Sequence, residues 1–237
     1  MRVTRTEERR TAAHLWLYEL SSRSVLLLLR LPGLPSAATW LSKVWLRHAR
    51  LVRHLRRSSY DAIVDGGASI GEFAALARLA RPRTPLLCVE PHPASAARLR
   101  RRGFTVVEAA LWHEPGRVTL SQPTHAATSC SVVATGAAGP TSWTVDAVRL
   151  DQLRIPGRCV LVKLDLQGAE IQALEGMGEL WDRCAGLLLE VSYGDRGTYE
   201  PLRARLAAQG FREAGTFNEL ETEAGIVEAD KLWLRRG

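Results

Sequence analysis

The chain has 237 residues, enough for one α/β domain with an appendage, and a formal net charge of +7. That charge belongs to residues 1–60, which hold twelve Arg or Lys against three Asp or Glu, whereas the remaining 177 residues carry a net charge of −2. The larger part of the chain therefore lacks the basic surface of a nucleic-acid-binding protein. Four scattered cysteines without Cys-x-x-Cys or Cys/His spacing predict no metal site and no disulfide framework, and they favour a reducing cytoplasm.

Residues 1–60 are predicted to form a basic helical extension, and residues 61–237 a single α/β domain. The second helix of the extension is expected at about residues 36–57, with a basic face opposite a largely apolar one. The apolar face consists of Trp40, Leu41, Val44, Trp45, His48, Leu51, Val52 and Leu55. The start of the chain lacks the features of a signal peptide, and its apolar run at residues 25–29 is too short to span a bilayer. Three roles stay open for the extension: packing on the α/β domain, a homodimer contact or substrate lid, and attachment to an anionic membrane surface.

The most informative segment is residues 63–71, where an apolar run ends in Asp65 and passes through glycines into a helix-like stretch. A second apolar run, residues 86–89, ends in Glu90, 25 residues after Asp65. This order predicts strand, tight turn, helix and strand, the opening βαβ unit of a nucleotide-type site. Glycines allow the backbone to approach a ligand where a β carbon would collide. Glu90 is placed to accept hydrogen bonds from both hydroxyls of a ribose.

The spacing of the glycines argues against two common phosphate-binding motifs. A phosphate loop needs Lys after its last glycine, and no Lys follows Gly71. A dinucleotide fingerprint needs Gly-x-Gly-x-x-Gly, which Gly66, Gly67 and Gly71 do not satisfy. The acid at the strand end, Asp65, would repel a pyrophosphate but suits an ammonium group, such as that in the methionine part of S-adenosylmethionine (SAM). A structural turn with an N-cap acid and no ligand stays open at this point.

Beyond Glu90 the chain continues in α/β order. A helix is expected at 94–102, a strand at 104–109 and a short strand at 117–120. A long loop at 121–142 and a strand within 143–150 follow. Further strands are expected at 160–165, 186–191 and 210–217, with helices at 169–177 and 199–209 between them, and a final edge strand at 231–235. The loop is rich in small and polar residues without periodicity, and so long a loop in a compact domain is either functional or disordered.

A third chemical segment covers residues 161–170, where a strand ends at Asp165 and a helix follows. Ligands of open parallel sheets sit beyond the carboxyl ends of the strands, so Asp165 should face the same crevice as Asp65 and Glu90. Lys163 is two residues before Asp165 and should point to the same side, where it needs a carboxylate partner or a route to solvent. Glu170 either complements the helix dipole or serves the site.

Segments 64–73, 89–93, 110–120 and 163–170, in this order, resemble the FkbM family of SAM-dependent methyltransferases. Residues 187–191 also look like that family's next strand, so the resemblance covers about residues 61–236. It implies a class I, Rossmann-like methyltransferase fold, with a mostly parallel seven-stranded sheet, a reversed edge strand and flanking helices. Ser69 departs from the family's usual Asn, and Gly66 stands where the family usually has an apolar residue.

By that likeness the cofactor is SAM, and its predicted binding residues are Asp65, Gly67, Ser69, Gly71, Glu90, Pro91, Ala110 and Leu111. The first acid and the glycines would line the methionine end, Glu90 would hold the ribose, and the adenine would lie near Pro91 and the turn at 108–111. Family members of known activity mostly methylate hydroxyls of sugars or secondary metabolites. The resemblance therefore implies an O-methyltransferase whose partner is a small-molecule acceptor. The cysteine usage predicts a cytoplasmic location, and the lack of basic charge in residues 61–237 disfavours a nucleic-acid acceptor.

An alcohol is a poor nucleophile at neutral pH, so a general base is expected to contribute roughly 10²- to 10⁴-fold. Asp165 is the first candidate and Glu190 the second, because both end strands that face the crevice. His113 and His125 are the loop alternatives, and Tyr193 is expected to shape the acceptor pocket. Two further functions stay open: methylation of a nitrogen, carbon or carboxylate, and a non-catalytic SAM-fold interaction module.

Overall fold

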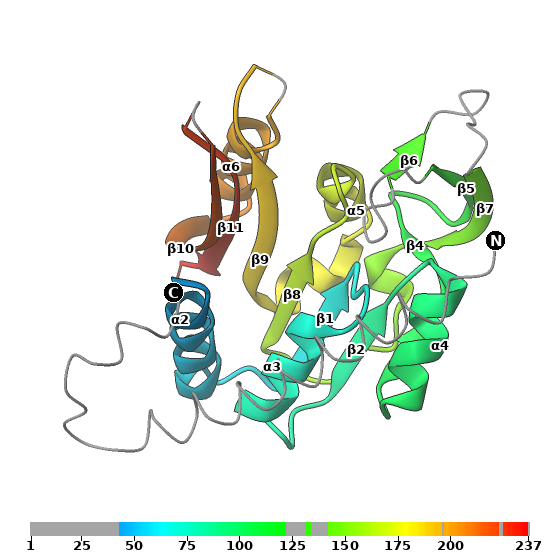
Figure 1. The fold of residues 1–237 in the computed structure, drawn as a ribbon, viewed down its shortest axis with the longest axis horizontal. Coiled ribbons are helices and arrows are strands. Elements are labelled where there is room, and N and C mark those ends of the chain that lie inside the picture. Colours follow the sequence, from blue (N-terminus) through cyan, green and yellow to red (C-terminus); the bar gives the residue numbers. More distant parts are fainter. Residues whose placement is uncertain (1–42, 122–130, 134–141, 196, 223–224, 237) are drawn as a thin grey trace.

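The computed structural model describes residues 43–121, 131–133, 142–195, 197–222 and 225–236. Its centre is a seven-stranded sheet in the order β10-β11-β9-β8-β1-β2-β3 (Figure 1). These strands are β1 (Ala62–Gly66), β2 (Leu86–Val89), β3 (Thr105–Val107), β8 (Val160–Leu164), β9 (Cys184–Ser192), β10 (Phe211–Thr222) and β11 (Gly225–Arg235). The predicted fold class, a mostly parallel seven-stranded sheet of the class I methyltransferase type, is confirmed.

The reversed strand is β11, which pairs antiparallel with both β9 and β10, whereas the pairs β9–β8, β8–β1, β1–β2 and β2–β3 are all parallel. The last strand of the chain is therefore inserted between two earlier ones, and β10 occupies the edge position expected for residues 231–235. A hairpin links β10 directly to β11, so the reversal needs no crossover connection.

Helices cover both faces of the sheet. They are α2 (Lys43–Arg57), α3 (Glu72–Ala80), α4 (Pro93–Arg101), α5 (Glu170–Glu175) and α6 (Tyr199–Ala208). Successive strand residues point to opposite faces. Ile63 accordingly joins the apolar cluster formed with α2 and α3, and its neighbour Val64 joins the cluster formed with α5 and α6. The continuous burial of β1 and β8 follows from this two-sided cover.

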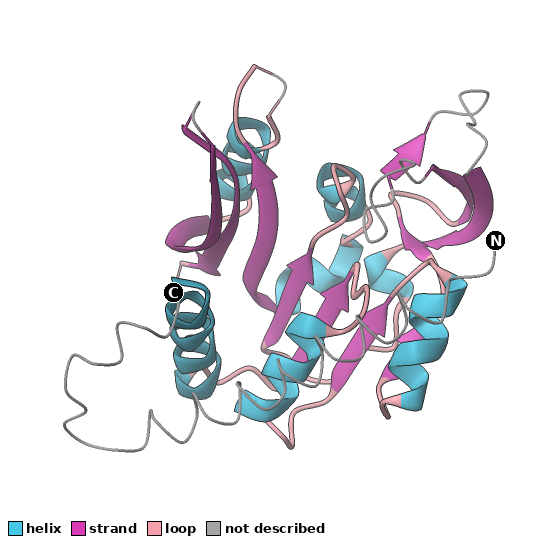
Figure 2. Cartoon of the chain, in the orientation of Figure 1, coloured by secondary structure: helices cyan, strands magenta, loops and turns pink. Residues whose placement is uncertain are grey.

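A second sheet, in the order β4-β7-β5-β6, stands beside the central one (Figure 2). Its strands are β4 (Ala110–Leu111), β5 (Gly116–Ser121), β6 (Ser131–Val133) and β7 (Ser142–Val148). The loop expected at 121–142 is therefore wrong at residues 131–133, which pair with β5 as an antiparallel strand. Its other residues, apart from 121 and 142, lie outside the described part of the chain. Ala110, Leu120 and Val145 form the buried centre of this sheet.

Helix α2 packs against the rest of the molecule. Its apolar residues Leu51 and Leu55 are buried in the cluster that also contains Phe217 of β10. At its carboxyl end the Arg81 guanidinium donates hydrogen bonds to the main-chain oxygens of Leu55 and Ser58, at 3.2 and 2.5 Å. These contacts pair carbonyl groups that a helix end leaves without partners. Among the described residues, no helix is long and apolar enough to cross a membrane. The expected first helix, and residues 36–42 of the second, lie outside the described residues.

Candidate active site

A pocket of about 380 Å³ lies at the carboxyl ends of β1, β2 and β8. Six of the eight predicted cofactor residues line it: Gly67, Ser69, Glu90, Pro91, Ala110 and Leu111. Further lining residues come from α2 (Leu51), from β8 and the turn after it (Lys163, Asp165 and Gln167), and from the β10–β11 pair (Asn218 and Asp230). Asp65, Gly71 and Glu190 are not among the lining residues. The structure thus joins three segments that the sequence singled out separately.

The glycine turn after β1 leaves no room for side chains. Gly67 has φ +68°, and a β carbon there would overlap the main-chain oxygen of Asp165. Gly71 has φ +85°, and a β carbon there would lie 2.6 Å from Leu99. Both positions therefore require glycine for conformation and for space. Gly66, the departure from the family pattern, has a related cause, because Leu111 and Leu164 occupy the space of its missing side chain at 2.7 and 2.8 Å.

Glu90 is a buried carboxylate held by the backbone. Its Oε2 accepts a hydrogen bond from the Ser69 N–H at 2.7 Å, and its Oε1 accepts one from the His92 N–H at 2.8 Å. Burial raises the pKa of Glu90, and these two hydrogen bonds oppose that shift. Each carboxylate oxygen accepts more than one hydrogen bond. The two backbone contacts therefore fix the group and leave acceptor capacity on the pocket side.

Three non-glycine residues of the described chain have positive φ, and all three line this pocket. They are Ser69 (φ 48°), Gln167 (φ 55°) and Asn218 (φ 46°). Backbone strain of this kind is characteristic of functional sites. At Ser69 it also gives a reason for the family's usual Asn, since Asn adopts the left-handed region more readily than most residues.

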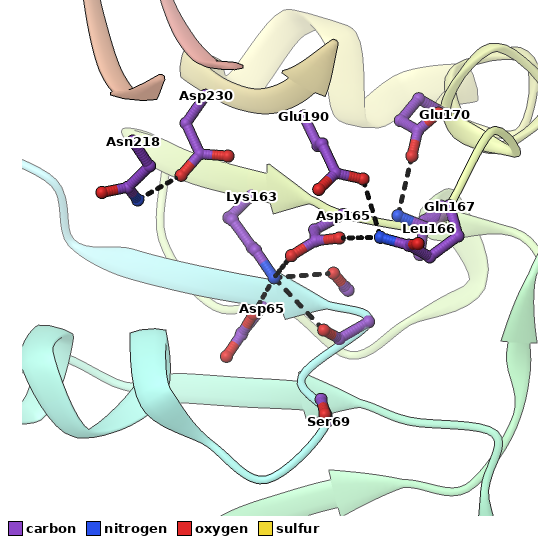
Figure 3. A network of polar contacts seen from close by, with 12 residues as sticks. Asp65, Ser69, Lys163, Asp165, Leu166, Gln167, Glu170, Glu190, Asn218 and Asp230 are labelled. Carbon is purple, nitrogen blue, oxygen red and sulfur yellow. Dashed lines mark hydrogen bonds and ion pairs between the residues drawn. The ribbon is translucent and has the colours of Figure 1, made fainter. Parts of the chain in front are cut away.

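Lys163 and Asp65 face each other on neighbouring strands, in register between β8 and β1. The Lys163 Nζ lies 3.2 Å from Asp65 Oδ1 and 3.3 Å from Asp165 Oδ2 (Figure 3). The expected carboxylate partner of Lys163 is thus confirmed. Asp65 is completely buried, and its oxygens make this ion pair without a well-aligned hydrogen bond. Burial raises the pKa of Asp65, and Lys163 opposes the shift.

Gln167 connects the two predicted base candidates. Its Nε2 donates to Asp165 Oδ1 at 3.1 Å and to Glu190 Oε2 at 2.8 Å (Figure 3). Burial acts to raise the pKa of Asp165, but Lys163 and Gln167 outweigh it, and the net shift is downward. Burial and the charge of Asp165 raise the pKa of Glu190 to about 9. At neutral pH Asp165 is therefore the ionised carboxylate of the two and Glu190 is protonated.

Glu170 stabilises the turn between β8 and α5. Its Oε1 accepts hydrogen bonds from the backbone N–H groups of Leu166 at 2.7 Å and Gly168 at 3.3 Å. The side chain is buried and points into its own turn. Of the two roles left open for this residue, the contacts support the local structural one.

The pocket also contains residues that the sequence did not single out for the site. Asn218 of β10 donates to Asp230 of β11 at 2.5 Å, and Leu51 comes from α2. Tyr193, expected to shape the acceptor pocket, packs on Tyr199 with ring centroids 5.1 Å apart and is not among the lining residues. His113 is not among them either, and His125 lies outside the described residues.

The chain also matches a known protein family. Residues 65–213 match the model of the methyltransferase FkbM domain. The chain belongs to the FkbM methyltransferase family. It is a SAM-dependent methyltransferase. Curated proteins give no significant sequence match.

Solved structures of similar shape include methyltransferases with different acceptors in their names. A precorrin-6y C5,15-methyltransferase from Geobacter metallireducens has 15% identity and a TM-score of 0.47, covering 86% of this chain and 95% of that one. An rRNA methylase from Streptococcus thermophilus has 14% identity and a TM-score of 0.46, covering 80% and 96%. A ribosomal protein L11 methylase from Lactobacillus delbrueckii has 10% identity and a TM-score of 0.43, covering 80% and 78%. Likenesses this distant do not bear on the acceptor of this FkbM methyltransferase.

Proposed function

We propose that this FkbM methyltransferase transfers the methyl group of SAM to a hydroxyl of a small molecule, such as a sugar or a secondary metabolite. The observation that carries the proposal is Asp165, an ionised carboxylate lining the same pocket as Gly67 and Glu90. A hydroxyl needs a base within hydrogen-bond reach to react at neutral pH, and a carboxylate at this place supplies one.

The pocket residues fit SAM. Glu90, fixed by two backbone N–H groups, offers its remaining acceptor capacity to the ribose hydroxyls. Pro91, Ala110 and Leu111 offer apolar surface for the adenine, and the bare backbone at Gly67 permits close approach. Bound SAM supplies an electrophilic methyl group on a sulfonium. The contribution of the protein is to hold donor and acceptor in line and to exclude competing water.

Asp165 takes the proton of the acceptor hydroxyl in this proposal. Lys163 binds its Oδ2 and Gln167 its Oδ1, so the carboxylate has a defined orientation before any acceptor arrives. Glu190 is protonated at neutral pH and adds no second negative charge beside it. The low pKa of Asp165 keeps it ionised throughout the physiological range, although it also limits its strength as a base.

The charges of the pocket favour a neutral acceptor over a polyanion. Lys163 is the only Lys or Arg among the described lining residues, and two carboxylates and two carbonyl oxygens already surround it. Asp165 and Asp230 add negative charge to the same wall. A nucleic-acid backbone or a carboxylate acceptor would meet repulsion here without a free cation to offset it. A neutral hydroxyl compound meets neither difficulty.

Labelled SAM tests the proposal directly. The protein is incubated with methyl-labelled SAM and an extract of its source organism, and the labelled product is identified by mass spectrometry and NMR. We expect a small molecule carrying a new methyl ether, and less of the labelled product with the Glu90→Ala variant when SAM is not saturating. A labelled nucleic acid or protein, or a methyl on nitrogen, carbon or carboxylate, would overturn the hydroxyl assignment.

We also propose a cytoplasmic location and an acceptor from secondary metabolism. The division at residue 60, and a peripheral membrane or homodimer contact through residues 1–60, belong to the same proposal. Co-sedimentation with anionic vesicles and analytical ultracentrifugation separate these two contacts. A monomeric protein that does not co-sediment with the vesicles would exclude both the membrane contact and the homodimer contact.

A further inference from the structure

The ammonium group of Lys163 lies where the glycine turn meets Asp165. Four oxygens surround Nζ: Asp65 Oδ1 at 3.2 Å, Asp165 Oδ2 at 3.3 Å, the carbonyl of Gly67 at 3.2 Å and that of Gly66 at 3.5 Å (Figure 3). The side chain is 10% exposed. A buried ammonium depends on such oxygens, because leaving any of its donors unpaired away from water is costly.

We infer that Lys163 is a positioning residue, which holds the carboxylate of Asp165 against the cofactor turn and so fixes the distance between base and methyl donor. The inference rests on the proposed role of Asp165 as the base. One ammonium contacts both the turn that is predicted to bind SAM and the group that is proposed to take the proton. A shift of either would therefore be transmitted to the other through a single atom.

A purely structural ion pair would need only one carboxylate beside Lys163. Asp65 alone would balance the charge of Lys163, and its complete burial makes it the partner that most needs the ammonium. Asp165 is different, because its side chain is 34% exposed and water would satisfy it if it turned outward. Its inward orientation is maintained by Lys163 on Oδ2 and by Gln167 on Oδ1.

The charges around Asp165 make its contact with Lys163 measurable through the pKa of Asp165. Titratable groups face it from β1 (Asp65), β9 (Glu190), α5 (Glu170) and β11 (Asp230), and all of these are acids. Lys163 is the cation that opposes them and lowers the pKa of Asp165. Burial acts to lower the pKa of Lys163, but Asp65 and Asp165 raise it, so the ammonium stays charged. Removing it must therefore raise the pKa of Asp165.

The test is a carboxyl titration by NMR on the full chain, with carbon-13 in the Asp side-chain carboxyls and with and without S-adenosylhomocysteine. The Asp165 signal is assigned by its loss in Asp165→Asn. In Lys163→Met we expect its midpoint to rise by about one pH unit or more, and in Lys163→Arg, which keeps the charge, by much less. Gln167→Leu, which removes the uncharged donor, should give a rise between these two.

Lys163→Met leaves Asp65 buried without a partner, so a second pair of variants guards against loss of the fold. Asp65→Asn removes that charge, and the double variant with Lys163→Met is compared with Asp65→Asn alone. An Asp165 midpoint that is the same in these two folded proteins would overturn the positioning role and leave the proposed function intact. Conversely, full methylation by Asp165→Asn would overturn its role as base, whatever the titration shows for Lys163.

Discussion

Gly67 and Asp165 lie against each other where the neighbouring strands β1 and β8 end, and a β carbon on Gly67 would overlap the main-chain oxygen of Asp165. The two segments are almost a hundred residues apart in the chain but share one wall of the pocket. The predicted cofactor turn and the proposed base are therefore in direct contact, and a displacement of one should displace the other.

Gly67→Ala should damage both stability and cofactor binding. The left-handed backbone alone costs an alanine about 1–2 kcal/mol, and the overlap with Asp165 adds to it. Gly168→Ala is the matched control, because Gly168 also has positive φ (+99°) but open space around it. Urea unfolding and calorimetry with S-adenosylhomocysteine measure the two effects. Equal losses in the two variants would show that conformation alone, and not the close approach to Asp165, requires glycine at position 67.

Glu90→Ala should weaken S-adenosylhomocysteine binding by about 1–3 kcal/mol, because charge-assisted hydrogen bonds to the ribose are lost. Calorimetry measures the change. Glu200→Ala is the control: it removes the same functional group from a surface ion pair with Arg203 on α6, outside the pocket. That variant should bind as the wild type does. Unchanged affinity in Glu90→Ala would put the ribose elsewhere.

Asp165→Asn should reduce turnover at least tenfold while cofactor binding survives, because the shape is kept and the basicity is lost. Since the pKa of Asp165 is lowered, the wild type should show no loss of turnover from this group between pH 6 and pH 9. Glu190→Gln, which imitates the protonated form, should cost less. Wild-type turnover in Asp165→Asn would exclude Asp165 as the base and leave Glu190 as the candidate. Loss of cofactor binding in this variant would instead mean that Asp165 serves to bind the cofactor.

Glu190 should make the protein less stable as the pH rises. Its pKa is raised from the ordinary 4.5 to about 9 in the folded state, so the folded protein holds a proton that the unfolded chain releases. Stability from this group is full below pH 4.5 and falls as the pH rises towards 9. The free energy of unfolding in urea should therefore change in favour of Glu190→Gln over the wild type as the pH rises. Between pH 5 and pH 9 the difference between the two proteins should shift by more than about 1 kcal/mol. A difference between the two proteins that does not change with pH would contradict the shift.

Removal of residues 1–57 should cause aggregation or loss of acceptor turnover. The truncation exposes the apolar surface that Leu51 and Leu55 cover, and it leaves the Arg81 guanidinium without the Leu55 carbonyl. A chain starting at Lys43 is the control, because it keeps every described contact of α2. Size-exclusion chromatography and the labelled-SAM assay report the outcome. A soluble and fully active 58–237 fragment would mean that the removed segment serves targeting alone.

The sequence predicted those parts of the site that depend on local pattern. Asp65, Glu90 and Asp165 each follow an apolar run, and parallel strands bring such positions to one edge. Their separation into a buried ion-pair partner, a carboxylate held by backbone N–H groups and a pocket carboxylate was not predictable, because it depends on contacts between segments far apart in the chain.

Asn218 and Asp230 were missed for a different reason. The β10–β11 pairing shifts register between Phe217 and Leu220, and Asn218 has positive φ at that irregularity. Neither residue belongs to a motif, and only the insertion of β11 beside β9 brings them to the pocket. Strand β6 was missed because its neighbours in sequence show no alternation of polar and apolar residues.

The packing of α2 also has a consequence for the order of synthesis. This helix leaves the ribosome before the sheet, but Phe217, which its apolar face and Arg50 contact, is translated near the end. Until β10 is complete, the nascent chain exposes an apolar helix surface without its final partner, a condition that invites aggregation or the binding of chaperones. The packing of the early helix against the late hairpin can therefore be completed only after β10 has been synthesised.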